Sequence, residues 1–412
     1  MKNYCKACGE KLKKIINIKK TPPCDLYTKK KIPNVKFYSL DLYSCVNCKL
    51  IQLLDIVEPE KIYKKYMYKT QHSIGLINHF KELFKNIDKE FRKKNKKFEK
   101  KNIEKNILDI GCNDGTLLSF FKKKKYKVIG IDPANNILND CKKKKIKLLN
   151  KFFTEKLSVK LSKKKKYNLI TANNVIANIP NLSDFFKGIS NLLSDEGLFV
   201  FETIYGPSIV KNKLIDMINS EHIFYFSLTS LKKILLMYNL RIVKTEILKS
   251  KGGSIRVFAE KTNLNKKHNL KNYKKILNSE KKDGFSNINR MIKYNKKYSE
   301  HQKNAYLFLK SLKQKKFSIH GFGASAGSTS IFYQYKLKDF INIIYDDNIL
   351  RHNLYLPGSS AKVVNPRKIK EYRPKYILVM AWRYINQIMM KHRQDKNKAI
   401  FISLLPKLKI YK

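Results

Sequence analysis

Carboxylates and glycines follow two apolar segments near residue 110, and their spacing suits the binding of a nucleoside cofactor. Residues 107–115 read Ile-Leu-Asp-Ile-Gly-Cys-Asn-Asp-Gly, so an apolar strand runs directly into an acidic turn that contains two glycines. A second apolar segment ends at Asp132, 21 residues after Gly111. This is about the ~20-residue spacing at which an acidic side chain meets a ribose. The pattern therefore predicts a Rossmann-like cofactor site.

The glycine spacing distinguishes between possible cofactors. Nicotinamide and flavin sites use G-x-G-x-x-G, which lets the backbone approach a pyrophosphate. Here the glycines stand only at positions 111 and 115, and Asp109 at the strand end can pair with a cationic amino group. S-adenosylmethionine carries such a group and no phosphate. Asp109, the turn and Asp132 therefore resemble the first two motifs of class I methyltransferases. The alternative is the strand and turn of another doubly wound protein.

Cysteine spacing predicts a metal site. Four of the seven cysteines form two C-x-x-C pairs that are separated by 36 residues: Cys5, Cys8, Cys45 and Cys48. Two such pairs can hold one tetrahedral zinc ion, and four thiolates leave that ion no open position for chemistry. The alternative is unligated thiols, because the spacer exceeds the commonest length of about 15–20 residues. Cys24 is interpreted as a residue of the spacer, and Cys112 as part of the cofactor turn.

Two segments carry candidate catalytic side chains. His222 follows Glu221 within an otherwise aromatic stretch, and an imidazole can take a proton from a carbon acid near neutral pH. Such a pair is often structural, but its position after a methyltransferase core favours catalysis. Tyr66 and Tyr68 flank Met67, so an extended segment turns both rings toward one face. For these tyrosines, packing and substrate contact both remain open.

Strands that alternate with helices predict a parallel sheet whose strand ends share one site. We expect a helix at about 73–99, strands at 107–110, 167–171 and 197–202, and a helix at 183–193. Asn173, Asn174 and Glu202 then join Asp109 and Asp132 near the same edge. The loop that begins Gly-Gly-Ser at residue 252 is a candidate to line the site.

A second α/β unit is predicted near the C-terminus. Residues 263–315 have helical spacing and are interpreted as a connector. After them, a strand leads into a turn with glycines at 321, 323 and 327, and Asp346 follows Gly321 by 25 residues. The backbone amides of this turn can hold a diphosphate, or the glycines can simply allow close packing. The predicted domains are residues 1–62 (zinc-binding), 63–262 (cofactor-binding), 263–315 (helical connector) and 316–412 (Rossmann-like).

Length and charge bound the function. At 412 residues the chain is expected to form two or three domains. Its net charge of +56 invites a nucleic-acid interpretation, but the lysines are spread along the whole chain. We therefore expect weak attraction to polyanions and no specific nucleic-acid partner. No apolar run approaches the ~18 residues of a membrane span, and no apolar signal core begins the chain, so a cytoplasmic location without a membrane partner is expected.

In this order, the motifs resemble a known family, the three-part C-methyltransferases that act on nucleotide-linked sugars. The resemblance runs from about Cys5 to the C-terminus. It rests on the four cysteines, Tyr66-Met-Tyr68, residues 108–115, Glu221-His222 with Tyr225-Phe-Ser, and residues 252–256, 321–325, 345–348 and 357–358. It implies an α/β fold in which a class I methyltransferase core is flanked by a small zinc-binding domain and a second Rossmann-like domain. A nucleotide-linked keto-sugar would lie between domains.

The resemblance also implies roles for individual residues. His222 would remove a proton next to the keto group, Glu221 would orient the base or bind substrate, and Tyr68 would contact the oxyanion or the sugar. The enolate carbon would then attack the methyl sulfonium. Eight residues are expected to bind S-adenosylmethionine: Asp109, Gly111, Asn113, Asp114, Gly115, Asp132, Asn173 and Asn174.

The chain departs from the family at two positions. Asn219 stands where the family usually has tyrosine, and Asn178 stands where it often has histidine. Either His222 acts with fewer helpers or the substrate has changed. Two rival functions follow, methylation of another acceptor (oxygen, nitrogen or RNA) and a noncatalytic relative that retains the cofactor pocket.

Overall fold

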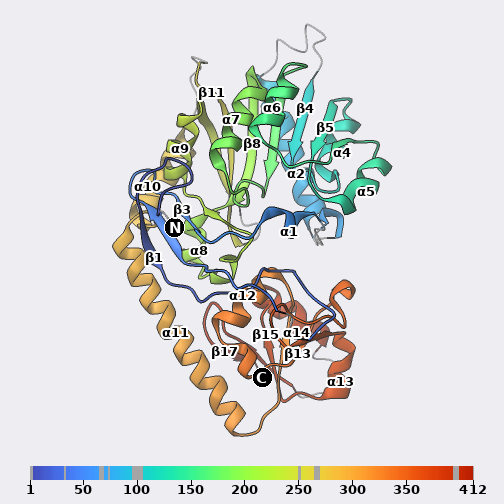
Figure 1. Cartoon of the computed structure of the whole chain (residues 1–412), viewed down its shortest axis with the longest axis vertical. Coiled ribbons are helices and arrows are strands. Elements are labelled where there is room, and N and C mark those ends of the chain that lie inside the picture. The colour runs from blue at the N-terminus through green and yellow to red at the C-terminus, as the bar shows by residue number, and fades with distance from the viewer. Residues whose placement is uncertain are drawn as a thin grey trace.

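Three sheets organise the described part of the chain. The computed structural model describes residues 3–31, 34–64, 69–72, 75–94, 105–248, 252–263, 270–392 and 399–411. Figure 1 shows two α/β units, one above the other, with the long helix α11 (Ile288–Gln314) running along one side and the N-terminal chain passing between them. No helix in the described ranges is long and apolar enough to cross a bilayer.

The upper unit is built on a mainly parallel sheet. Over the described residues its strand order is β10-β11-β8-β7-β4-β5-β6, with β11 antiparallel to both neighbours and the last five strands parallel. The strands are β4 (Asn106–Ile110), β5 (Lys127–Ile131), β6 (Lys147–Leu149), β7 (Tyr167–Asn173), β8 (Leu193–Ile204), β10 (Leu240–Leu248) and β11 (Ser254–Lys261). The predicted fold class is confirmed.

Helices cover both faces of this sheet, which explains why its central strands are apolar on both sides. On one face α6 (Glu155–Ser162) and α7 (Leu182–Leu192) pack, and Phe185 of α7 shares a buried cluster with Ile170. On the other face α2 (Leu76–Lys94) and α4 (Thr116–Lys123) pack, and Leu83 of α2 shares a cluster with Leu169. The turn between β4 and α4 thereby stands at the carboxyl edge of the sheet.

The N-terminal sheet includes a strand from the middle of the chain. Its order is β1 (Leu12–Ile16), β2 (Leu42–Cys45), β3 (Ile51–Gln52) and β9 (Phe224–Tyr225), and all neighbours are antiparallel. The Leu53 amide also donates to the Ile223 carbonyl oxygen at 2.9 Å. Because β9 comes directly after Glu221 and His222, the N-terminal sheet holds the segment that carries the candidate base.

The lower unit is the second Rossmann-like domain. Its sheet has the order β14-β13-β12-β15-β16-β17 within the described part of the chain, and only β17 is antiparallel. The strands are β12 (Ile319–Phe322), β13 (Ile343–Tyr345), β14 (Lys362–Val364), β15 (Tyr376–Val379), β16 (Ile400–Ser403) and β17 (Lys409–Tyr411). Its helices include α12 (Ala326–Gln334), α13 (Ile369–Tyr372) and α14 (Ile385–His392).

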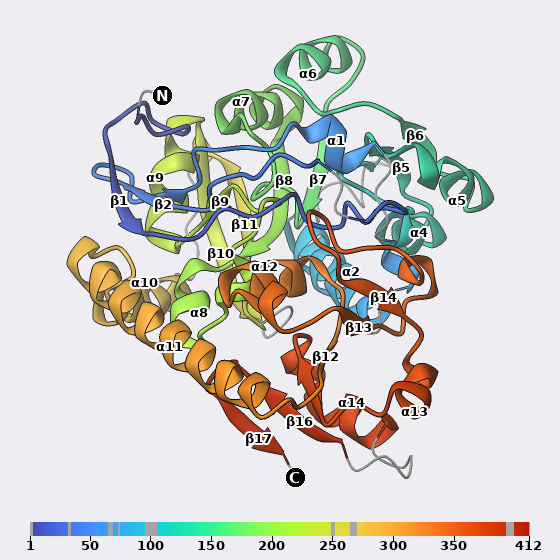
Figure 2. The same ribbon diagram turned by 60° about the horizontal axis from the view of Figure 1, so that its bottom comes forward.

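A bridging segment, residues 24–28, ties the N-terminal part to this lower unit. The Tyr27 hydroxyl donates to the Ala324 carbonyl oxygen, and Arg351 pairs with Asp25 at 3.0 Å. Thr28 and Tyr355 form an antiparallel bridge. In Figure 2 the N-terminal chain again runs from β1 and β2 across to the lower unit. The domains are therefore joined by specific contacts as well as by the chain.

The predicted connector is helical in its described part, with α10 (Lys271–Asp283) and α11. α10 also stabilises the core, because the buried Glu280 carboxylate accepts hydrogen bonds at the start of α9 (Leu228–Met237). Its donors are the Leu228 amide (2.5 Å), the Thr229 amide and hydroxyl (2.9 and 2.6 Å) and the Tyr205 hydroxyl (2.8 Å). The domain limits at 62, 262 and 315 stay a prediction.

Replacing Glu280 with alanine is expected to lower the free energy of unfolding by about 3 kcal/mol, because several buried donors lose a charged acceptor. Thermal and urea unfolding would measure the change. The matched control is Glu82→Ala, which removes an exposed helix carboxylate that pairs with Lys85 and should leave the unfolding transition almost unchanged. Equal effects of the two substitutions would contradict this role of Glu280.

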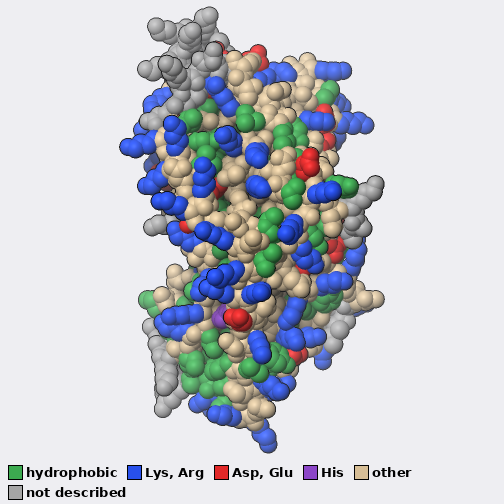
Figure 3. Space-filling view, turned by 90° about the vertical axis from the view of Figure 1, so that its left-hand side faces the viewer, with side chains coloured by type: hydrophobic (Ala, Val, Ile, Leu, Met, Phe, Trp, Pro, Cys, Tyr) green, Lys and Arg blue, Asp and Glu red, His purple; other side chains and the backbone are tan. Residues whose placement is uncertain are grey.

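Positive charge is dispersed over the surface. Figure 3 shows Lys and Arg side chains scattered over the whole visible face, across both units, with few acidic side chains among them. A nucleic-acid site would gather such charge into one patch or stripe. This face supports the interpretation of the lysines as solvated surface.

Candidate active site

One large cavity gathers most of the predicted site residues. Its volume is about 850 Å³, and it extends from the carboxyl edge of the core sheet to the second Rossmann-like domain. Its lining includes eight of the predicted residues: Asp109, Gly111, Asn113, Asp132, Asn173, Asn174, Glu221 and His222. The loop residues Gly253 and Ser254 line it as well, as the sequence predicted.

The turn after β4 adopts a conformation that requires glycine at position 111. Gly111 has φ +68°, and an added Cβ would lie 2.3 Å from a methyl carbon of Val175. The Asn113 amide donates to Asp132 Oδ2 at 2.9 Å. The carboxylate at the end of β5 therefore fixes the shape of the turn at the end of β4.

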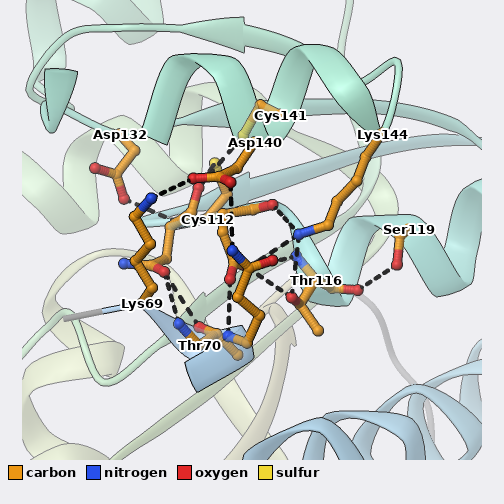
Figure 4. Close-up of polar contacts among 12 residues, drawn as sticks. Lys69, Thr70, Cys112, Thr116, Ser119, Asp132, Asp140, Cys141 and Lys144 are labelled. Atoms are coloured by element: carbon orange, nitrogen blue, oxygen red, sulfur yellow. Dashed lines mark hydrogen bonds and ion pairs between the residues drawn. The ribbon is translucent and has the colours of Figure 1, made fainter. Parts of the chain in front are cut away.

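A short helix, η1 (Thr70–His72), packs against the outside of this turn (Figure 4). The Thr70 amide donates to Asn113 Oδ1 at 3.0 Å, and the Gln71 amide donates to Asp114 Oδ2 at 2.8 Å. Asp114 also accepts from the Thr116 amide at the start of α4. The side chains of Asn113 and Asp114 thus organise the turn.

Three predicted residues are placed differently from the rest. Asp114 and Gly115 belong to the turn but are buried, and they are not among the residues that line the cavity. Their role in cofactor binding stays a prediction. Tyr68, together with Tyr66, lies outside the described residues.

Asp109 forms an anionic position in the cavity. It is 3% exposed and accepts a hydrogen bond from the Thr171 hydroxyl at 2.6 Å. The pKa of Asp109 is raised to about 7: burial is the main cause, the hydrogen bond from Thr171 lowers the pKa, and the nearby charge of Asp132 raises it. Such a carboxylate favours a cationic ligand, because a nearby positive charge would stabilise its ionised form. It therefore fits the amino group of S-adenosylmethionine.

Asp132 and Asn173 also fit that cofactor. Each Asp132 oxygen accepts one backbone amide, from Asn113 or Ala134, at 2.9 Å. A carboxylate offers about four acceptor positions, so two remain for ribose hydroxyls. The amide oxygen and nitrogen of Asn173 are buried and have no hydrogen-bond partner among the described residues. Since buried polar groups are normally satisfied, Asn173 is suited to hydrogen-bond a ligand.

The raised pKa of Asp109 predicts that cofactor binding depends on pH. In the free protein, Asp109 must lose its proton before it can pair with the ammonium group, so affinity should rise roughly tenfold per unit below pH 7 and level off above it. Titration calorimetry between pH 5.5 and 7.5 would measure this. Asp109→Asn should bind roughly 10- to 100-fold more weakly and show a flat profile. The same slope in this variant would assign the dependence to another group.

The catalytic segment holds His222 in a defined tautomer. His222 Nδ1 lies 2.9 Å from the Met217 carbonyl oxygen. A carbonyl oxygen can only accept, so Nδ1 carries the proton in the neutral ring and Nε2 is the basic nitrogen. Glu221 is 7% exposed, and its amide donates to Asn219 Oδ1 at 3.0 Å. The Asn219 side chain therefore shapes the turn that presents Glu221.

Basic side chains line the wall that the second Rossmann-like domain contributes. Arg383 pairs with the buried Asp216 at 2.7 Å, and Arg351 pairs with Asp25. The first residues of α12 lie on the same wall: Ser325, Ala326 and Gly327. Helix N-termini and arginines both favour anions.

The glycine turn before α12 also packs closely. An added Cβ at Gly323 (φ +99°) would lie 2.8 Å from the Ala381 amide nitrogen. The Ala324 amide donates to Asp346 Oδ2 at 2.6 Å. Close packing therefore accounts for Gly323, while the start of α12 faces the cavity.

Glu202 does not contribute to the site. Its carboxylate is buried, pairs with Arg256 at 2.5 Å and lies 2.7 Å from His79 Nε2. Glu202 lies near the end of β8, as the sequence predicted, but it is not among the residues that line the cavity.

Other residues that line the cavity were not predicted from the sequence, including Asp25, Tyr63, Phe152, Phe153, Arg351 and Arg383. Phe152 and Phe153 follow β6, so their place after a third parallel strand was a usable signal. For Asp25 and Arg351 no local signal exists.

The four cysteines of the two C-x-x-C pairs, Cys5, Cys8, Cys45 and Cys48, lie close together. Their sulfur atoms all lie within 4.8 Å of one another, with Cys5 to Cys48 at 3.6 Å and Cys8 to Cys45 at 3.4 Å. These distances are too long for a disulfide of about 2.05 Å. Tetrahedral zinc with bonds of about 2.3 Å requires sulfur atoms about 3.8 Å apart, so the cluster fits a structural zinc ion.

Comparisons with known proteins agree with this geometry. Three family models match along the chain: a zinc binding domain (residues 5–63), a methyltransferase domain (77–245) and a C-methyltransferase C-terminal domain (249–406). The C-methyltransferase NovU of Streptomyces niveus is 23% identical over 377 residues, which cover 90% of this chain and 87% of NovU.

Solved structures resemble part of the chain. Magnesium protoporphyrin IX methyltransferase from Synechocystis PCC 6803 with bound SAH is 13% identical and covers 45% of this chain and 83% of its own, with a TM-score of 0.34. An S-adenosylmethionine-dependent methyltransferase from Clostridium acetobutylicum is 15% identical and covers 44% of this chain and 98% of its own, with a TM-score of 0.33.

Fold, site and family models together define a class I methyltransferase that uses S-adenosylmethionine and carries a structural zinc site. The chain is an S-adenosylmethionine-dependent C-methyltransferase, and it matches in order the models of a zinc-binding domain, a methyltransferase domain and a C-methyltransferase C-terminal domain.

Proposed function

We propose that this enzyme methylates a carbon of a nucleotide-linked keto-sugar next to the keto group. The observation that carries the proposal is that the acidic cofactor turn, the Glu221-His222 pair and an arginine-bearing wall line one cavity. Its volume of about 850 Å³ is near the upper end of the range of roughly 300–1,000 Å³ for small-molecule sites, which suits a cofactor and a substrate together. An RNA acceptor would need an open basic surface.

The core residues would bind and orient the cofactor. Asp109 would pair with the amino group, Asp132 would accept from the ribose hydroxyls, and Asn173 would hydrogen-bond the nucleoside. When bound, S-adenosylmethionine supplies the electrophilic methyl group that the activated substrate carbon takes from its sulfur. Gly111 keeps the turn free of a side chain that would occupy this space.

His222 would remove the substrate proton. The proton passes from the carbon to Nε2, while the C–H electron pair forms the carbon–carbon double bond of an enolate and negative charge moves to the keto oxygen. The Met217 carbonyl oxygen, which holds Nδ1–H, orients the ring and stabilises the imidazolium that results. Glu221 lines the same cavity and would orient the sugar.

The C-terminal wall would recognise the diphosphate. Arg383, Arg351 and the amides at the start of α12 line the end of the cavity away from the core sheet. A diphosphate bound there would position the sugar between that wall and His222. Bidentate contacts from arginine suit phosphate oxygens.

A substrate panel tests the function. Purified enzyme would be incubated with S-adenosylmethionine and uridine- or thymidine-diphosphate-linked keto-hexoses, and products followed by mass spectrometry. A mass gain of one methylene, with nuclear magnetic resonance locating the new methyl on carbon, is the expected result. Methylation on oxygen or nitrogen, or no methylation of any member while nuclease-sensitive acceptors are modified, would overturn the proposal.

A further inference from the structure

The cavity contains a phenol that the motif analysis did not assign. Tyr63 ends helix α1 (Pro59–Tyr63) of the N-terminal part, and it lines the cavity together with Asn178, Glu221 and His222. Its hydroxyl oxygen is buried.

Contacts on both sides of Tyr63 fix its position. The preceding Ile62 is buried with Tyr38 and Val57, and Tyr63 packs against this cluster. The following residue, Lys64, accepts a hydrogen bond from the Asn135 amide of the core at 3.1 Å. α1 is therefore anchored to its own domain and to the methyltransferase domain, so the ring of Tyr63 is held at the junction.

The electrostatic environment keeps this phenol protonated. Burial is the main cause that raises the pKa of Tyr63 well above its usual value, the Glu221 charge acts in the same direction, and the Asn178 side chain acts in the opposite direction. A neutral hydroxyl is a good hydrogen-bond donor to developing negative charge. Asn178 and Glu221 therefore both act on the Tyr63 hydroxyl.

Asn219 and Asn178 stand where the family resemblance in the sequence leads us to expect acid–base side chains. Asn219 hydrogen-bonds the Glu221 amide, and an asparagine amide cannot act as an acid or base. Asn178 has the same limit. Removal of a proton next to a ketone still requires a donor for the oxyanion, and the described cavity lining offers Tyr63 beside these two asparagines.

We infer that Tyr63 is a catalytic residue of this enzyme, which donates a hydrogen bond to the keto oxygen and stabilises the enolate formed by His222. Asn178 positions the phenol. The inference rests on the proposed function, since it needs a substrate that passes through an enolate. The site would then be shared between domains, with the base on the methyltransferase segment and the oxyanion donor on α1.

The test separates proton removal from methyl transfer. Wild-type enzyme with S-adenosylhomocysteine in D₂O would be given uridine- or thymidine-diphosphate-linked 4-keto-6-deoxyglucose, and deuterium exchange next to the keto group followed by nuclear magnetic resonance. Tyr63→Phe should slow this exchange and kcat by about 10- to 1,000-fold, the range for loss of one oxyanion donor, with KM changed less than about threefold. Tyr126→Phe, a buried tyrosine outside the cavity lining, is the matched control.

Different outcomes overturn different statements. Exchange at the wild-type rate in Tyr63→Phe, with His222→Ala inactive, would overturn the role of Tyr63 and leave the proposed function intact. No exchange in the wild-type enzyme would overturn the enolate chemistry itself. Should Tyr63→Phe lose S-adenosylmethionine binding or its zinc, Asn178→Leu supplies the second test, because it removes the positioning amide and should slow exchange several-fold.

Discussion

The His222→Ala protein is expected to bind S-adenosylmethionine with unchanged affinity and to transfer methyl groups about 10²- to 10⁴-fold more slowly, the usual contribution of a general base. The proposed cofactor contacts come from Asp109 of β4 and from Asp132, which directly follows β5, and neither lies in the segment that carries His222. The substitution should therefore lower the rate of methyl transfer without changing the affinity for the cofactor. Titration calorimetry and steady-state kinetics measure the two effects.

A second histidine provides the matched control. His301 Nε2 also lies close to a backbone carbonyl oxygen, that of Leu404, at 2.8 Å, but His301 is not among the residues that line the cavity. His301→Ala should keep near-normal kcat. Added imidazole should partly restore His222→Ala, because it can enter the space left by the ring. Full activity in His222→Ala would show that another group removes the proton.

Loss of zinc is expected to inactivate the enzyme without abolishing cofactor binding. In zinc-finger peptides a structural zinc site contributes an apparent ~10–16 kcal/mol, so Cys45→Ser or chelation should unfold the sheet of β1, β2 and β3. That sheet pairs with β9 next to His222, and its loss should lower methyl transfer at least tenfold. Asp109 and Asp132 belong to another sheet and should still bind cofactor.

Three measurements check this prediction. Metal analysis should find about one zinc per wild-type chain and much less in Cys45→Ser. Hydrogen exchange at the Leu53 amide, which bonds to the Ile223 carbonyl oxygen, should accelerate in the variant. The control is Cys141→Ala. Cys141 is buried and is not one of the four clustered cysteines, so this variant should keep its zinc. Normal activity in zinc-free protein would contradict the dependence of the active site on the zinc site.

Local sequence signals were sufficient for the elements that carry the cofactor turn. The apolar strand before Gly111 and the carboxylate at 132 are features of a strand–turn–helix unit, and each lies within a few residues of the element that positions it. The cysteine pairs were also recognisable from spacing, because a metal imposes that spacing on the chain. These parts of the site were predictable for physical reasons.

The remaining parts depend on packing between distant segments. Arg351 and Asp25 are 326 positions apart, and neither residue has a neighbour that signals the ion pair. The pairing of β9 with β3 is equally nonlocal, since two-residue strands have no periodicity to recognise. Glu202 lies near the end of β8 as expected, yet Arg256 and His79 bind its carboxylate. The position of a residue on a strand predicts which edge of the sheet it lies at, but the direction of its side chain depends on the residues that bind it.

The bridging segment at residues 24–28 has a consequence for synthesis of the protein. Asp25 and Tyr27 leave the ribosome early, but Arg351 and Ala324, which they bind, emerge only near the end of translation. Until then the cavity lacks the wall that Arg351 and Arg383 provide, although the cofactor turn has already been made. Because nonlocal contacts form late, a nascent or truncated chain should capture cofactor before it can methylate the proposed substrate.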